Sequence, residues 1–269
     1  MGQAVLPGVW ALEYLARAVE GVFPEAVLTS CTAVHFDKFL ALPPPGIAAV
    51  DAVAEIAPLA GGLFETVLLT RHVAPRSGIS RMKTHVRACF GLRRRAGHDR
   101  RPEPRPVEAP RDVFEVAPER LYAEMVPFGR TFRNVVSPVR LATGGARATV
   151  AGGDPKGEDT FLRLGSPFPL DAAFHAACAW AQRYRGIVAF PVALQQRLIH
   201  QPTCFGHRYD AEIRFREEEG QDLLFDLYLR EGGGRLCEVV RGLVMRDVSG
   251  GKLQPPDWIR TGLNDDVTR

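Results

Sequence analysis

Two stretches of the chain carry apolar residues at helical spacing. Across residues 8–22 apolar side chains recur every three or four positions, which leaves Arg17 and Glu20 to face water. Pro7 precedes this run, as suits the start of a helix. A second apolar run, from Leu170 to Tyr184, is rich in alanine. The pattern predicts one long helix in each half of the chain.

Each helical run goes with a series of shorter stretches that have strand character, separated by Gly, Pro and Ser. These stretches are residues 27–42, 48–56, 63–73 and 83–92 in the first half and 188–200, 207–215, 223–230 and 235–247 in the second. Three consecutive glycines, 232–234, predict a hairpin turn between the last two. A helix with several antiparallel strands, occurring twice, predicts an α+β fold built as a pseudo-dimer. Sites in such folds commonly form where the two copies meet.

The domain organisation follows from this repeat and from composition. Residues 1–92 form the first half, and residues 119–253 form the second. Between them, residues 93–118 are rich in Arg and Pro, too polar and too broken to build a core element, and are expected to be a linker. Residues 254–269 are expected to be an exit linker or a frayed tail.

Charge and cysteine content narrow the class of protein. The 34 basic and 31 acidic residues give a net charge of +3, too even a balance to indicate a nucleic-acid partner, and the Arg-rich linker lacks interleaved aromatic residues. The five cysteines are scattered, without the close pairs of metal or redox motifs. No run reaches the roughly 18 apolar residues of a membrane span, and no basic region opens a signal peptide. We therefore expect a cytoplasmic protein that uses neither membrane nor metal.

The main candidate for chemistry is the pair Asp171 and His175, four residues apart at the start of the alanine-rich run. On a helix this spacing puts both side chains on one face. Because the neighbours of Asp171 are apolar, its carboxyl is expected to stay protonated and to act as an acid. The alternative is that Asp171 caps the start of the helix, a position that favours Asp.

Several short motifs resemble, in their order, those of one enzyme family. The opening from Gly2 to Gly8 is similar to the start of the dehydratase domains of polyketide and polyunsaturated-fatty-acid synthases. In that family a catalytic histidine begins a His-x-x-x-Gly-x-x-x-x-Pro motif, and Gly2 and Pro7 match its Gly and Pro. The matching histidine would lie three residues upstream of Met1.

The other resemblances cover nearly the whole chain. Residues 34–40 and 85–91 look like two strands of the family's first half, and residues 189–192 like a strand that follows the second helix. Residues 126–132 resemble the Tyr-Gly-Pro-x-Phe segment: Gly129 and Phe132 are kept, whereas Phe128 replaces the tyrosine and Arg130 the proline, so a hydroxyl near the site is lost. Asp171 and His175 match the Asp-x-x-x-Gln/His motif.

The resemblance implies a double hotdog fold, two long helices each wrapped by an antiparallel sheet. It implies a lyase of polyketide or fatty-acid synthesis that removes water from a 3-hydroxyacyl thioester and leaves the 2,3-enoyl thioester. The substrate would be carried on the phosphopantetheine of an acyl carrier protein, with no metal and no redox cofactor. Asp171 would be the acid and His175 would orient it. Pro7, Gly8, Phe128, Gly129 and Phe132 would bind substrate, with the Gly8 amide polarising the thioester carbonyl. The alternative for Gly8 is a tight entry turn after Pro7.

The missing base leaves two interpretations open. Either the sequence starts late, and the chain as given is weakly active or inactive, or it is a non-catalytic copy that binds acyl chains or acts as a scaffold in a synthase. His35 and His85 are expected to be surface or packed residues rather than substitute bases. An isomerase or a domain that shapes cyclisation would use much the same residues. Expected partners are the acyl carrier protein, to which the Arg-rich linker offers positive charge, other synthase domains and, through the N-terminal halves, a second copy.

Overall fold

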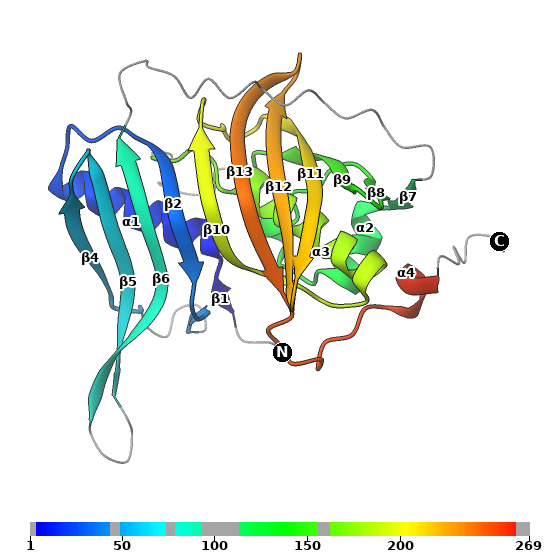
Figure 1. Cartoon of the computed structure of the whole chain (residues 1–269), viewed down its shortest axis with the longest axis horizontal. Helices are drawn as coiled ribbons and strands as arrows, with labels where there is room; N and C mark the ends of the chain where they lie inside the picture. The colour runs from blue at the N-terminus through cyan, green and yellow to red at the C-terminus, as the bar shows by residue number, and fades with distance from the viewer. Residues whose placement is uncertain (1–3, 44–48, 74–78, 93–112, 155–161, 262–269) are drawn as a thin grey trace.

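The computed structural model describes residues 4–43, 49–73, 79–92, 113–154 and 162–261. Eleven of the described strands form one antiparallel sheet (Figure 1). In sheet order they are β4 (Ala52–Leu59), β5 (Leu63–Val73), β6 (Ser80–Leu92), β2 (Leu28–Phe36), β10 (Phe190–Ile199), β13 (Arg235–Arg246), β12 (Asp222–Glu231), β11 (Arg208–Glu219), β9 (Gly145–Ala151), β8 (Val139–Ala142) and β7 (Phe114–Val116). The short strands β1 (Val5–Leu6) and β3 (Leu40–Ala41) pair separately.

Two long helices lie against this sheet, one in each half. Helix α1 (Gly8–Val22) packs on β4, β5 and β6, and buries an apolar stripe that includes Leu12, Leu15 and Val19. Helix α3 (Phe168–Arg185) contacts β8 to β12, and every residue from Phe168 to Gln182 is buried. Figure 1 shows α1 behind the strands of the first half and α3 behind those of the second. No helix in the described part of the chain is long and apolar enough to cross a membrane.

The halves are joined through the centre of the sheet, where β2 pairs with β10. On β10 the Arg197 guanidinium makes two hydrogen bonds, of 2.8 and 2.9 Å, to the Glu238 carboxylate on β13. Their side chains are 1% and 2% exposed. Such a buried pair resists the loss of either partner, because the remaining charge would be left without a counter-charge or water.

Glu13 makes a second connection between the halves. From the middle of α1 its buried carboxylate accepts hydrogen bonds from the backbone amides of Arg163, at 2.7 Å, and Leu164, at 3.0 Å. These residues lie just before α3. Burial raises the pKa of Glu13, and the two amides and Arg17 oppose that shift. This contact therefore fixes the position of the segment before α3 relative to α1.

The observed secondary structure agrees with the prediction wherever apolar residues follow a clear helical or strand spacing. The helix predicted over residues 8–22 is confirmed, and α3 extends the second predicted helix by two residues at its start and one at its end. The glycine turn is confirmed, with Gly233 and Gly234 both at positive φ. The predicted strand over 27–42 divides into β2 and β3, and β8 and β9 were not predicted.

Two segments expected to lack structure contribute to the core instead. Within 93–118, residues 93–112 lie outside the described residues, but β7 pairs with β8 and buries Val116. The tail, residues 254–269, contains α4 (Asp257–Thr261), in which Trp258 and Ile259 are buried; residues 262–269 lie outside the described part. The expectation of an exit linker or frayed end is therefore wrong for residues 257–261, because these apolar side chains pack on the second half.

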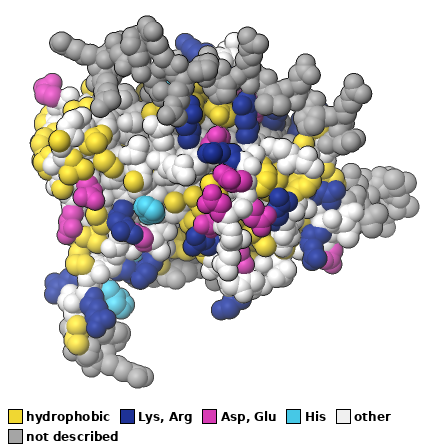
Figure 2. All heavy atoms as spheres, in the orientation of Figure 1, with side chains coloured by type: hydrophobic (Ala, Val, Ile, Leu, Met, Phe, Trp, Pro, Cys, Tyr) yellow, Lys and Arg dark blue, Asp and Glu magenta, His cyan; other side chains and the backbone are white. Residues whose placement is uncertain are grey.

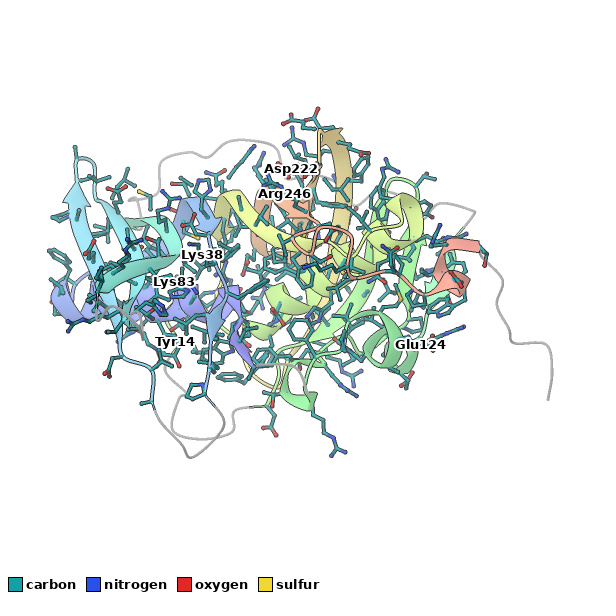
Figure 3. All side chains as sticks on the ribbon, turned by 90° about the horizontal axis from the view of Figure 1, so that it is seen from below. Tyr14, Lys38, Lys83, Glu124, Asp222 and Arg246 are labelled. Atoms are coloured by element: carbon teal, nitrogen blue, oxygen red, sulfur yellow. The ribbon has the colours of Figure 1, made fainter. Side chains whose placement is uncertain are left out.

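The buried ion pair predicts a stability difference between two arginines that make similar pairs. Arg197→Ala leaves Glu238 buried without its partner and is expected to lower the free energy of unfolding by about 3–5 kcal/mol. Arg246 binds Asp222 in the same two-bonded manner, but this pair is more exposed (Figure 3), so Arg246→Ala should cost less than about 1 kcal/mol. Urea unfolding of both variants checks this. Equal losses would contradict the role given to burial.

Candidate active site

The candidate pair lies on α3, in which every residue from Phe168 to Gln182 is buried. Alanine dominates α3, which favours a helix and lets the surrounding strands approach closely. Asp171 is the fourth residue of the helix, and its own amide bonds to the Pro167 carbonyl; the first helical amide, that of Phe168, donates to the Ser166 hydroxyl at 3.4 Å. The alternative that Asp171 caps the helix is therefore wrong. Gly186, at φ 65°, ends the helix in the left-handed conformation.

Asp171 and His175 face each other, as the spacing predicts. Oδ2 of Asp171 lies 3.3 Å from Nε2 of His175, and the side chains are 9% and 4% exposed. Within the described part of the chain neither atom has a well-formed hydrogen bond. Two buried polar atoms without partners are costly, and they are common where a ligand or water completes the bonding. The pair is thus close, buried and incompletely satisfied.

Burial changes the protonation of both groups in the direction of neutrality. It raises the pKa of Asp171 from 3.8 to about 7 and lowers the pKa of His175 from 6.5 to about 3. In each case the cause is loss of water around the charged form. Near neutral pH the structure therefore holds a carboxyl that retains its proton easily beside an uncharged imidazole.

Tyr122 completes this group and was not predicted as a site residue. It lies in the single π-helical turn η1 (Leu121–Met125), which follows the short helix α2 (Pro118–Arg120). Its buried hydroxyl accepts the Val135 amide at 2.9 Å and lies 3.3 Å from Nδ1 of His175. A hydroxyl that donates to Nδ1 keeps the ring proton on Nε2, toward Asp171. A tyrosine hydroxyl therefore lies beside His175, although Phe128 carries none.

Aromatic side chains surround the pair, including two of the predicted substrate-binding residues. The Phe128 ring lies 4.5 Å from that of His175. Phe132, in the 3₁₀ turn η2 (Arg130–Phe132), lies 5.5 Å from Phe168 at the start of α3. Gly129 precedes η2 and is exposed, with open space where a Cβ would be. The structure therefore brings Phe128 and Phe132 to the candidate site, with Gly129 in the connecting turn.

Pro7 and Gly8 lie at the start of α1, which reaches the start of α3 through Trp10. The Trp10 and Phe168 rings meet edge to face at 6.0 Å. Pro7 is the N-cap residue, and the first turn has backbone amides without partners inside the helix. A Cβ on Gly8 would lie 2.6 Å from the Phe36 ring, so close packing by Phe36 is a structural reason for glycine here. Helix α1 begins at Gly8 itself.

The other described histidines are bound elsewhere or exposed. Both ring nitrogens of His85 are engaged, by Thr70 and by the Lys38 carbonyl. His35 is exposed on β2, and His207 pairs with Glu231 at the surface. His85 is thus a packed residue, as expected, and of the histidines in the described segments only His175 contacts Asp171. Gly2 and His98 lie outside these segments.

Comparison with known proteins places the chain in a family. The family model for the polyketide synthase dehydratase N-terminal domain matches residues 100–255, more than half of the chain. The chain belongs to the polyketide synthase dehydratase family. The matched region of this family member contains Asp171, His175 and the segment around Phe128, whereas Pro7 and Gly8 lie outside it. No curated protein sequence matches the chain.

Solved structures of dehydratase domains have the same fold. The dehydratase domain of RzxB from Pseudomonas fluorescens is 17% identical, with a TM-score of 0.69 over 91% of this chain and 86% of that one. A trans-acyltransferase dehydratase domain from Brevibacillus brevis is 15% identical, with a TM-score of 0.66 over 92% and 87%. A trans-acyltransferase polyketide synthase enoyl-isomerase is 14% identical, with a TM-score of 0.63 over 91% of each. The predicted double hotdog, an α+β fold, is confirmed.

The contact between Tyr122 and His175 predicts the tautomer of the imidazole. At pH 7 we expect His175 to be neutral with its proton on Nε2. Tyr122→Phe should allow both tautomers, because Nδ1 loses its donor. Nitrogen-15 chemical shifts of the ring measure this directly, with Tyr14→Phe as the control because Tyr14 is exposed on α1 (Figure 3). A parent protein protonated on Nδ1 would contradict the assignment.

The opposite pKa shifts predict opposite pH effects on stability. The raised pKa of Asp171 favours the folded state below pH 3.8, an advantage lost as the pH rises to about 7. The lowered pKa of His175 favours the folded state above pH 6.5, an advantage lost as the pH falls to about 3. Relative to the parent, Asp171→Asn should therefore gain stability as the pH rises from 4 to 7, and His175→Gln should gain it as the pH falls. Urea unfolding at each pH tests this, and difference curves with the same slope would refute it.

Proposed function

We propose that the chain is a dehydratase module that acts on 3-hydroxyacyl thioesters carried on an acyl carrier protein. The observation that supports this most is the buried Asp171 carboxyl, whose pKa of about 7 suits a general acid at neutral pH. The family and the fold agree with this reaction. Its products are the 2,3-enoyl thioester and water.

In the proposed reaction a base removes the α-proton, the carbon–oxygen bond to the 3-hydroxyl breaks, and the double bond forms between C2 and C3. Asp171 gives its proton to the departing hydroxyl, which leaves as water. The carboxylate that remains faces Nε2 of His175 at 3.3 Å, where a ring N–H stabilises its charge. Amides at the start of α1, including that of Gly8, would polarise the thioester carbonyl.

The general base is the part of the reaction that the chain does not match. The family uses a histidine before the Gly and Pro of its first motif, and His175, neutral with a pKa of about 3, is a poor proton acceptor. We therefore assign the base to a histidine at the family's motif position, four residues before the glycine that Gly2 matches. The scheme uses neither a metal nor a redox cofactor, because the elimination of water is redox-neutral and the base and Asp171 account for both proton transfers.

A non-catalytic module that binds or spaces acyl chains is the second candidate. It is favoured by Phe128 and Arg130 in place of the family's Tyr and Pro. An isomerase remains a third assignment for the same pair, since it also needs an acid beside an acyl thioester. The assay below distinguishes the three by product.

The test measures turnover of a 3-hydroxyacyl thioester by the 269-residue chain and by a version extended at its N-terminus with the family histidine. The extended version should form the 2,3-enoyl product, and the shorter chain should be slower by about 10²–10⁴-fold. Asp171→Asn in the extended version should lose a similar factor, whereas Asp51→Asn, at an exposed carboxyl, should not. Equal rates for the extended version and the 269-residue chain would contradict the assignment of the base. A 2,3-enoyl thioester is assayed in parallel: its conversion to the 3,4-enoyl isomer without turnover of the 3-hydroxyacyl thioester indicates an isomerase, and binding without turnover of either substrate indicates the second candidate.

A further inference from the structure

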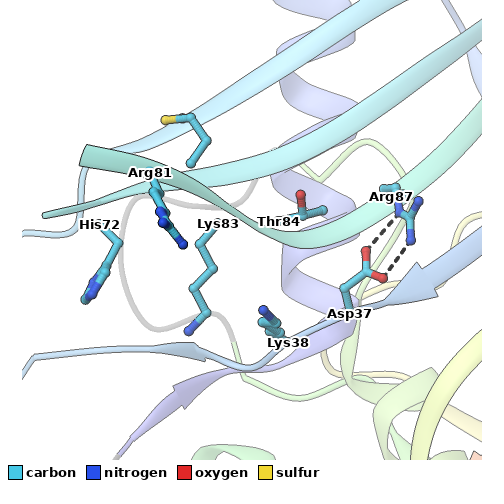
Figure 4. Close-up of a pocket in the computed structure, with 8 residues that line it drawn as sticks. Asp37, Lys38, His72, Arg81, Lys83, Thr84 and Arg87 are labelled. Atoms are coloured by element: carbon cyan, nitrogen blue, oxygen red, sulfur yellow. Dashed lines mark hydrogen bonds and ion pairs between the residues drawn. The ribbon is translucent and has the colours of Figure 1, made fainter. Parts of the chain in front are cut away.

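A charged pocket of about 520 Å³ lies on the first half of the molecule, apart from the residues of the candidate active site. Figure 4 shows His72 from β5 and Arg81 and Lys83 from β6 projecting into one space, with Lys38 facing them from the segment after β2. Asp37 and Arg87 also line the pocket, whereas Met82 and Thr84 alternate with Arg81 and Lys83 along β6 and project to the other face of the strand (Figure 4). Arg81 and Lys83 on β6 and Lys38 after β2 thus place three cationic groups around one hollow, with the His72 ring beside them.

The positive charge of Lys38, Arg81 and Lys83 is not balanced by Asp37, the carboxylate that lines the pocket. Asp37 is bound on both oxygens by Arg87, at 2.7 and 2.9 Å. In the described segments no carboxylate pairs with Lys38, Arg81 or Lys83. Figure 2 shows Lys and Arg side chains gathered with a histidine at this end of β5 and β6, at the lower left. The pocket therefore holds an excess of positive charge that an anion would neutralise.

Hydrogen bonds hold the backbone at Lys38 in place. The Asp37 and Lys38 amides both donate to the His85 carbonyl on β6, at 2.9 and 3.3 Å. The His85 ring, buried beneath the pocket, donates from Nδ1 to the Lys38 carbonyl at 3.1 Å and accepts from the Thr70 hydroxyl at 2.8 Å. Burial and the charges of Lys83 and Lys38 lower the pKa of His85, which suits its use as a neutral bridge. The backbone at Lys38 is therefore fixed opposite Arg81 and Lys83.

We propose that this pocket is a binding site for phosphate esters. A phosphate dianion matches an excess of cations, since Arg81 can bind two of its oxygens in a fork and Lys38 and Lys83 add point charges. The volume falls within the roughly 300–1,000 Å³ of small-molecule sites.

Two sources would supply this chemistry: a free phosphate ester, or the phosphate that joins a pantetheine arm to a carrier protein. The pocket adjoins α1, because Phe36, next to Asp37, packs on Gly8. The inference depends only on the pocket, so it does not require the proposed reaction. Its test measures binding without turnover. Failure of the phosphate-binding test therefore leaves the proposed dehydratase reaction untouched, and failure of the dehydratase assay leaves the phosphate site untouched.

The experiment titrates the full chain with pantetheine 4′-phosphate by calorimetry at low salt. Pantetheine without phosphate should not bind, and inorganic phosphate should compete. The double variant Lys38→Ala, Lys83→Ala should weaken binding at least tenfold, and raising the salt concentration should weaken it as well. Lys252→Ala is the matched control, because Lys252 is an exposed lysine outside the pocket, and it should change affinity less than twofold.

Adenosine 5′-monophosphate distinguishes the two sources. If it binds as tightly as pantetheine 4′-phosphate, the pocket recognises the phosphate of any free ester. If it binds at least tenfold more weakly, the pantetheine arm is the source. The proposal is overturned if pantetheine binds as well as its phosphate, or if the double variant keeps full affinity while its circular dichroism shows a folded protein. It is equally overturned if a carrier protein lacking the arm binds through Lys38 and Lys83 as tightly as the phosphate esters, since the pocket would then recognise carboxylates.

Discussion

The enclosure of α3 by the sheet is the constraint on which the site depends. A helix surrounded in this way must be apolar on all sides, and the alanines of α3 let neighbouring elements approach it closely. Any polar group on such a helix loses its water, which is why burial dominates the pKa of both Asp171 and His175. The packing of the second half and the chemistry of the pair thus have one physical origin. The connection made by Glu13 then sets where the first helix meets this enclosed core.

Burial also determines whether Asp171 and His175 form an ion pair or a neutral pair. Two opposite charges at this depth would need several further hydrogen bonds to offset the loss of hydration, and the described surroundings offer only the Tyr122 hydroxyl to His175. A neutral carboxyl beside a neutral imidazole avoids that cost. It also keeps the proton on Asp171, where an acid catalyst needs it, instead of transferring it to His175. Aromatic rings around the pair, such as Phe128, exclude water and preserve this state.

The sequence allowed prediction of those features that depend on neighbours along the chain. The α1 helix follows from its apolar stripe, and the unusual setting of Asp171 from the alanines beside it. Strands β8 and β9 escaped prediction because their residues are mostly small, and their place beside α3 gives them stability that propensity does not. Tyr122 escaped prediction because its hydroxyl meets a histidine 53 positions away. The cationic pocket likewise exists only once three distant segments are folded together.

The C-terminal helix has a consequence for where this domain is taken to end. Trp258 of α4 donates to Glu124 of η1, and the Arg120 guanidinium lies over the same indole ring. The π-helical turn that carries Tyr122 is therefore braced by residues more than a hundred positions further along. A version cut after residue 253 would retain all thirteen described strands and still lose the support behind a hydroxyl of the site. The functional boundary of the domain extends beyond its last strand, to α4.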